Sequence, residues 1–241
     1  MKKAVGFDQK ILLHQLDFIA REIPRTDSRQ ELYEIVEEYL TADIAGQKSR
    51  LNARTILFKI WYLVEDQHLY LQREALRLFD EVTQEERKVL HWGMTLLAYP
   101  FFADLVKELG ILFKIQDEVP SEQLSRKMKS LYGDRRRVEV SISATMTSLR
   151  SWEAVVSEKR NTQALPFNRT VIRSELLKQW TAEVLIRVLQ VTSLPIEEFK
   201  DHPLLFPFRY DMTTDELDKD RFEIIRQGVD MRMISLKNDK K

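Results

Sequence analysis

Residues 120–171 constrain the fold more than any other stretch, because signals for two helices and a β-hairpin follow one another there. The first part, PSEQLSRKMKSLYGD, and the second, RRRVEVSISATMTSLRSWEAV, space their apolar residues as helices do. The third part, VSEKRNTQALPFNRTV, has two runs typical of strands on either side of a polar turn. Two helices, a tight turn between them and a hairpin, in this order, predict a winged helix-turn-helix.

The limits of the first helix follow from local signals. We expect the hydroxyl of Ser121 to cap its N-terminus. Leu124, Met128 and Leu131 then recur on one face. Gly133 follows the last of them and can adopt the left-handed conformation that ends a helix.

The second helix is expected to begin about three residues later, which is the spacing that a helix-turn-helix needs. Asp134 is its expected cap and Arg135 its first residue. Its apolar stripe consists of Val138, Ile142, Met146, Leu149 and Trp152. The opposite face holds mostly short side chains, from Arg136, Val140, Ser143, Ala144, Thr147 and Ser151. Such a face can approach the floor of a DNA major groove, with Arg137 and Arg150 beside it to meet phosphates.

A β-hairpin is expected to complete the module. Val155 and Val156 begin its first strand, residues 159–162 form a polar turn, and residues 167–172 form the returning strand. Lys159 and Arg160 at the tip are placed to contact backbone phosphate. The predicted DNA-binding residues are therefore Arg135, Arg136, Arg137, Ser143, Thr147, Arg150, Lys159 and Arg160.

The charge distribution supports this interpretation. Residues 119–173 contain 11 Lys or Arg and 5 Asp or Glu, whereas the whole chain has 38 of each. A neutral chain with a basic middle indicates a local electrostatic footprint for a polyanion. Two alternatives stay open. Many winged helices bind proteins or have only a structural role, and residues 135–137 could be an ordinary solvated helix start.

The rest of the chain predicts a mainly α fold, and only 6 Gly and 7 Pro in 241 residues agree with that. We expect a helical bundle in residues 1–100, the winged helix-turn-helix in 101–173, and a C-terminal helix with a small β-hairpin in 174–241. Helices are expected at 8–23, from a cap at Asp27, at 52–64 and at 66–82. A capping box at Thr83 and a proline at position 100 predict two more helix starts.

Three signals mark the C-terminal part. Ser174 is expected to cap a helix to about Val191. Residues 203–208, PLLFPF, form an apolar loop that must pack on something. Residues 221–236 contain two short apolar runs around Gly228, which predict the hairpin.

No motif for catalysis or cofactor binding is present. The chain has no Cys, and its four His residues lack the spacing of a metal site. There is no phosphate loop, GxGxxG or GxSxG. We therefore expect no enzyme activity, no cofactor, no metal and no small-molecule substrate. The N-terminus lacks a secretory signal and no apolar run is long enough to span a membrane, so a cytoplasmic protein without membrane contact is expected.

Three stretches together resemble the BrxA family of BREX phage-defence systems. They are residues 44–57, IAGQKSRLNARTIL; residues 90–108, LHWGMTLLAYPFFADLVKE; and the helix that ends at Leu149-Arg150-Ser151-Trp152. They cover about half of the chain. The resemblance implies a non-enzymatic, DNA-binding accessory of a bacterial defence locus, with a first half like an antitermination-factor bundle and a winged helix in the middle.

Three functions remain open from the sequence. The first is binding of double-stranded DNA with little sequence preference through the basic middle. The second is a protein–protein scaffold for other defence-system proteins, through the 203–208 loop and the C-terminal hairpin. The third is RNA binding by the helical half, with Arg50, Arg54 and Lys59 as candidates.

Overall fold

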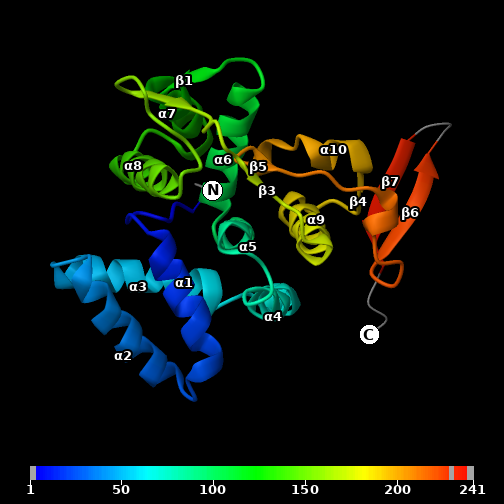
Figure 1. Ribbon diagram of the computed structural model, residues 1–241. Helices are drawn as coiled ribbons and strands as arrows, with labels where there is room; N and C mark the ends of the chain where they lie inside the picture. Colours follow the sequence, from blue (N-terminus) through cyan, green and yellow to red (C-terminus); the bar gives the residue numbers. More distant parts are fainter. Residues whose placement is uncertain (1–3, 228–230, 238–241) are drawn as a thin grey trace.

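The computed structural model describes residues 4–227 and 231–237, and this part of the chain is mainly helical with a few short strands, as predicted. The first half is built from α1 (Leu13–Glu22), α2 (Arg29–Tyr39), α3 (Gln47–Trp61), α4 (Leu69–Leu78), α5 (Gln84–Ala98) and α6 (Pro100–Phe113). In Figure 1, α5 lies near the centre, with α1 to α3 on one side and α9 on the other. Among the described residues, none of the helices has the length and hydropathy needed to cross a bilayer.

The N-terminal segment differs from the prediction. Residues 4–12 are not helical, and α1 begins at Leu13 instead of residue 8. The backbone N–H of Ile11 donates to Ser148 Oγ at 2.9 Å, and Trp152 Nε1 donates to the Ile11 carbonyl at 2.9 Å. These bonds to a distant helix take the donor and acceptor that a local helix would use. The second helix is capped by Ser28 and not by Asp27, because Ser28 accepts from the N–H of Glu31.

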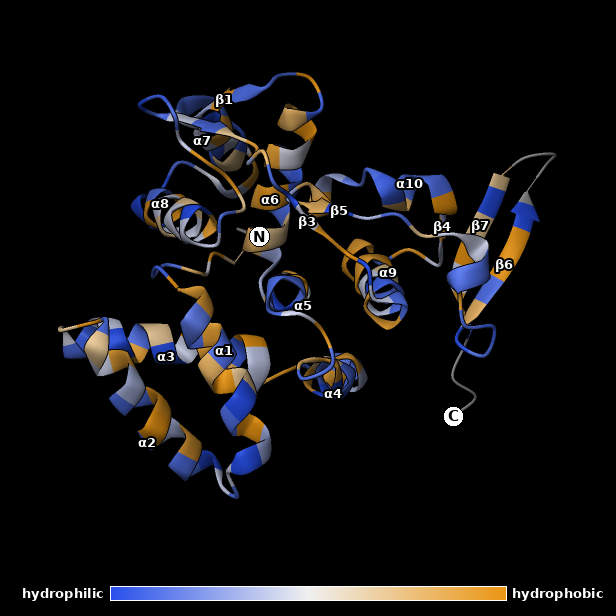
Figure 2. Cartoon of the chain, viewed as in Figure 1, coloured by the Kyte–Doolittle hydropathy of each residue, from blue (hydrophilic) through white to orange (hydrophobic). Residues whose placement is uncertain are grey.

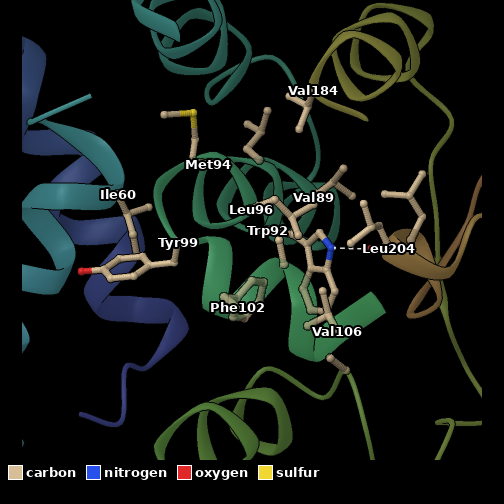
Figure 3. Packing of buried hydrophobic residues seen from close by; sticks show 14 of the residues in the cluster. Ile60, Val89, Trp92, Met94, Leu96, Tyr99, Phe102, Val106, Val184 and Leu204 are labelled. Atoms are coloured by element: carbon tan, nitrogen blue, oxygen red, sulfur yellow. Dashed lines mark hydrogen bonds between the residues drawn. The ribbon is translucent and has the colours of Figure 1, made fainter. Parts of the chain in front are cut away.

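Helices α5 and α6 form the centre of the core, and both begin where the sequence predicts. Thr83 and Glu86 form the reciprocal capping box of α5, and Pro100 is the first residue of α6. Trp92 of α5 is buried, and its Nε1 donates to the Leu204 carbonyl at 2.8 Å (Figure 3). This bond joins the first half of the chain to the C-terminal part. One hydrophobic cluster includes residues from all three predicted domains, whose boundaries stay a prediction.

The middle of the chain contains β1 (Glu118–Pro120), α7 (Ser121–Tyr132), α8 (Arg136–Ser151) and β2 (Thr162–Ala164). β1 pairs antiparallel with β2, and Val156 forms an isolated antiparallel bridge to Ala164. The returning strand is therefore residues 162–164 and not residues 167–172 as predicted. Within that predicted strand, β3 (Thr170–Val171) pairs in parallel with β5 (Phe208–Arg209) instead. This pairing joins residues almost 40 positions apart, so the local sequence pattern could not predict it.

The two caps predicted here are wrong. Ser121 is the first residue of α7, and its hydroxyl accepts from Gln163 Nε2 at 3.2 Å instead of capping the helix. Asp134 pairs with Lys129 at 2.9 Å, and α8 has Arg135 at its N-cap with no side-chain cap bond.

The turn between these helices is three residues long, as predicted. Gly133 has the expected positive φ of 86°, although its ψ of 153° lies outside the left-handed helical region. The predicted core residue Leu131 is 41% exposed, and Tyr132 is buried in its place. The Tyr132 hydroxyl donates to Asp104 Oδ2 at 2.8 Å, which fixes α7 on α6.

The C-terminal part contains α9 (Glu175–Leu189), β4 (Ser193–Pro195), α10 (Ile196–Lys200), the 3-10 turn η4 (Pro203–Leu205), β6 (Phe222–Gln227) and β7 (Met231–Leu236). Ser174 caps α9 as predicted, by accepting from the N–H of Leu177. The predicted hairpin is confirmed as the antiparallel pair β6–β7, to which β4 adds in the order β4-β7-β6. Gly228 lies outside the described residues.

A buried ion cluster attaches this hairpin to the helices. Arg221 donates to both carboxylate oxygens of Glu74, each at 2.7 Å, and to Glu183 at 2.7 Å. The apolar loop at residues 203–208 packs on α6, as expected of it. Gly110 permits this approach, because a Cβ at that position would lie 2.1 Å from the Pro203 carbonyl oxygen. The apolar side chains of the 203–208 loop, Leu204, Leu205, Phe206 and Phe208, are buried.

Candidate nucleic-acid interface

Helix α8 has one buried face and one open face. All five residues of the predicted apolar stripe are buried, and the polar residues Ser141, Thr145 and Ser148 are buried beside them. Trp152 at the end of the stripe contacts Phe7, Trp92 and Phe102 edge-on or tilted. The opposite face is therefore the only one that α8 can present to a partner.

Arg136 and Arg137 are exposed at the N-terminal end of this helix. The Arg136 side chain is 86% exposed and lies 3.5 Å from Glu139, while Arg137 is 65% exposed and lies 3.8 Å from Asp8. Exposed pairs of this kind are worth only about 0–1 kcal/mol. Both guanidinium groups can thus exchange these carboxylates for phosphates at little cost.

The open face continues with small side chains. Ser143 is exposed and Val140 is 37% exposed, while Ala144 and Thr147 are half-buried. Thr147 Oγ1 donates to the Ser143 carbonyl at 2.7 Å, so its hydroxyl proton is used within the helix. Ser143 and Thr147 therefore lie together on the open face, as predicted.

Two of the predicted DNA-binding arginines make internal hydrogen bonds. Arg135 donates to the Tyr132 carbonyl at 2.9 Å, at the turn between α7 and α8. Arg150 donates to Gln163 Oε1 at 3.1 Å, and Gln163 in turn donates to Ser121. Arg150 thus connects α8 to β2 and α7. The sequence reasoning missed Gln163, which no local pattern distinguishes from a surface glutamine.

The turn before β2 carries the other two predicted residues. Lys159 Nζ lies 2.6 Å from Glu118 Oε1, and this hydrogen bond raises the pKa of Lys159 above its usual value. Arg160 is exposed and forms no ion pair with residues 4–227 or 231–237. Arg160 is therefore the cation of this turn that is ready for an external anion.

Pairing reduces the positive field that the charge count of this region predicts. Lys129 lies 2.9 Å from Asp134 and 2.7 Å from Glu139, and the hydrogen bond from Lys129 lowers the pKa of Glu139. Among the exposed cations predicted to bind DNA, Arg136 and Arg137 have only long contacts to carboxylates, at 3.5 and 3.8 Å. Arg160 has no ion pair with the described residues.

A histidine–aspartate pair is the arrangement closest to an acid–base group. His91 Nε2 lies 2.9 Å from Asp17 Oδ1, but burial lowers the pKa of His91 and its ring is only 1% exposed. The rings of Trp61 and Phe79 flank it. In the described ranges, no three His, Asp or Glu side chains gather closely enough to hold a metal ion.

The chain matches no protein-family model, no curated protein and no solved structure.

Proposed function

We propose that residues 100–164 form a winged helix-turn-helix that binds duplex DNA, with α8 as the helix that enters the major groove. The order α6, β1, α7, α8, bridge at Val156 and β2 supports this assignment. In such modules the second helix of the pair inserts while the strand ribbon lies along the backbone. The proposed protein is a non-enzymatic binder with little sequence preference.

The open face of α8 is the observation that carries the proposal. An α-helix with its side chains is about 10–12 Å wide, and the B-DNA major groove is about 12 Å wide. Ser143, Ala144 and Thr147 are short enough for α8 to approach the bases closely. Arg136 and Arg137 extend from the end of the same face, where they can contact backbone phosphates.

The turn before β2 supports the same assignment. Arg160 projects from residues 157–161, which link the Val156 bridge to β2, and Lys159 lies next to it. A second cationic contact beside the inserted helix fixes the orientation of the module on the duplex without reading sequence.

The biological setting is proposed from the resemblance of three sequence stretches to the BrxA family. It supports a role as a DNA-binding accessory of a BREX-type bacterial phage-defence system, where the protein also contacts other defence proteins. The exposed Arg136 and Arg137 at the end of the open face of α8 support that role.

The test is fluorescence anisotropy of a random-sequence duplex as salt is varied. Replacing Arg136→Glu and Arg137→Glu together is expected to lower affinity about a hundredfold and to reduce the salt slope by about two. The matched control replaces Arg25→Glu and Arg77→Glu, two exposed arginines on other helices that also pair with nearby glutamates. Equal losses in both variants, or a wild-type affinity that ignores salt, would refute the proposal.

A second candidate function is a scaffold, and the C-terminal hairpin favours it. β6 is an edge strand, and Ile224, Ile225 and Met231 of the hairpin are 37%, 43% and 49% exposed. Figure 2 shows a hydrophobic stretch in β6 and a hydrophilic end. An exposed edge strand can pair with another chain. The 203–208 loop does not contribute, because its apolar side chains are covered within the molecule.

No observation favours RNA binding by the helical half. Arg50 donates to the carbonyls of Ile44 and Ala45, and Arg54 pairs with Glu37. Lys59 lies 4.4 Å above the Tyr99 ring. All three candidate cations thus have partners inside the molecule.

A further inference from the structure

A groove beside the C-terminal end of α6 is lined by cations from several segments of the chain. One depression of about 400 Å³ and another of about 480 Å³ share Arg169, Lys200, Asp201 and Phe208, so they adjoin, and together they are called the groove below. It lies where α6, β3, β5 and α10 meet (Figure 1). Drug-sized and nucleotide-sized ligands occupy pockets of about 300–1,000 Å³.

Most cations of this groove have no anionic partner in the described part of the chain. Its lining includes Lys114, Arg169, Arg173, Lys200 and Arg209. Among residues 4–227 and 231–237, none of these five side chains forms an ion pair. Lys178 also lines the groove, but it pairs with Glu216 at 2.5 Å. The two acidic side chains that line the groove, Asp201 and Asp211, leave an excess of positive charge.

Two backbone contacts define the walls of the groove. The close approach of Gly110 to Pro203 sets one wall, and the parallel pairing of β3 with β5 sets the other. Phe206 and Phe208 are 7% and 6% exposed, so they form a packed floor and are not free to stack on a base. Arg169 is half-buried, and its Nη1 donates to the Phe206 carbonyl at 3.2 Å. This bond holds the guanidinium in place and leaves its other N–H groups for a ligand.

We propose that this groove binds a phosphate-bearing ligand of nucleotide size. The proposal is separate from DNA binding by α8 and does not depend on it. Phosphate is favoured because a fixed guanidinium donates two parallel hydrogen bonds to phosphate oxygens, and the lysines add point charges around a group that carries several negative charges. The buried aromatic floor argues against a single nucleic-acid strand, which would need exposed rings for its bases.

His202 lies in the groove lining and reports on its field. Burial lowers the pKa of His202 to about 4, and the charges of Lys107 and Lys114 act in the same direction. The groups that face it also include Lys200 and Asp201 at the neighbouring end of α10. A phosphate bound among these lysines would oppose their effect and raise the pKa of His202.

The test measures binding of tripolyphosphate and of ATP to the full chain by isothermal titration calorimetry at low salt. We expect both ligands to bind. The double variant Lys200→Glu/Arg209→Glu should bind each of them about tenfold more weakly or worse. Asp201→Asn should instead strengthen binding two- to threefold, roughly the effect of removing one nearby like charge across solvent. Binding of ATP and not tripolyphosphate would assign the site to nucleotides, and equal binding would assign it to the phosphates alone.

Two controls separate this site from the α8 face. The Arg136→Glu/Arg137→Glu variant should bind tripolyphosphate as the wild type does, and the Lys200→Glu/Arg209→Glu variant should bind duplex DNA normally. An NMR titration should show the pKa of His202 rising when tripolyphosphate is added. Absence of binding by the wild type, or binding that Lys200→Glu/Arg209→Glu and Asp201→Asn leave unchanged, would overturn the proposal.

Discussion

The α8 face and the groove beside α6 both carry arginine and lysine, but they hold these cations differently. On the α8 side, Arg136 lies near Glu139 and Lys159 lies 2.6 Å from Glu118. In the groove, Lys200 and Arg209 have no ion pair with the described residues. The sequence around α8 is the more basic of the two. In the structure, however, the cations of the groove have fewer ion pairs with carboxylates than those of the α8 face.

The difference shows how chain connectivity affects charge. A helix or a turn places its cations within reach of acidic residues a few positions away, as in Arg136 and Glu139. The groove brings together Lys114, Arg169, Arg173, Lys200 and Arg209 from separate segments of the chain, and none of them forms an ion pair with the described residues, although Asp201 and Asp211 also line the groove. A local charge count therefore predicts where cations are, while the fold decides which of them are free to bind an anion.

The largest effect that separates the two regions is expected for Gly110→Ala. Its Cβ would lie 2.1 Å from a backbone oxygen of Pro203, so α6 and η4 must move apart. Overpacking of this kind costs about 1–3 kcal/mol. Thermal unfolding should show the loss of stability, and calorimetry below the unfolding transition should show loss of tripolyphosphate binding while duplex DNA still binds.

Gly46→Ala is the matched control for this substitution. A Cβ there would meet only Ser49 Oγ at 3.8 Å, and the backbone has an ordinary negative φ. We expect a loss of about 0.5–1 kcal/mol, because alanine is a poorer helix N-cap residue than glycine. If Gly110→Ala behaves like Gly46→Ala, the wall of the groove is not set by this contact.

Elements with strong local signals were predictable from the sequence. Thr83 with Glu86, Pro100 and Ser174 each start a helix where the pattern indicates, because capping and proline geometry depend only on adjacent residues. The apolar stripe of α8 was found for the same reason, since helical spacing alone defines it.

Features that depend on distant partners were not predictable. Residues 4–12 avoid the helix because Ser148 and Trp152 bind the backbone of Ile11. The returning strand was placed too late, because β1 was not expected and it pairs with residues 162–164. The groove has no signal in the sequence at all, since its cations come together only after α6, β5 and α10 have packed.

A smaller effect is expected in the pH dependence of stability. The pKa of His202 is about 4 in the folded chain against an ordinary value of 6.5. Since the unfolded chain takes up this proton first, the contribution is fully present above pH 6.5 and is lost as pH falls toward 4. In the wild type, the Leu204 N–H donates a hydrogen bond to His202 Nδ1 at 3.2 Å. The substitution His202→Asn removes the titrating group and keeps a side-chain acceptor for this hydrogen bond.

Denaturant unfolding at pH 7 and pH 5 measures this effect. The wild type should lose about 2 kcal/mol more than His202→Asn over that interval. His68 and His91, whose pKa values burial also lowers, are present in both proteins and cancel in the difference. Saturating tripolyphosphate should reduce the difference, because a bound anion raises the pKa of His202. An equal pH response in both proteins would mean that neither burial nor the charges of Lys107 and Lys114 lower the pKa of His202.

The smallest effect on DNA binding is expected for the ion pair between Lys159, in the turn before β2, and Glu118 of β1. Replacing Glu118→Gln and Lys159→Met together leaves the net charge unchanged and removes a pair that is already satisfied at 2.6 Å. Arg160→Met removes a cation without such a pair in the described chain. Anisotropy with duplex DNA should therefore stay within about twofold for the double replacement and fall several-fold for Arg160→Met, with a salt slope smaller by about one. The reverse order would mean that DNA displaces Glu118 from Lys159, and that pairing in the free protein does not decide which cations bind.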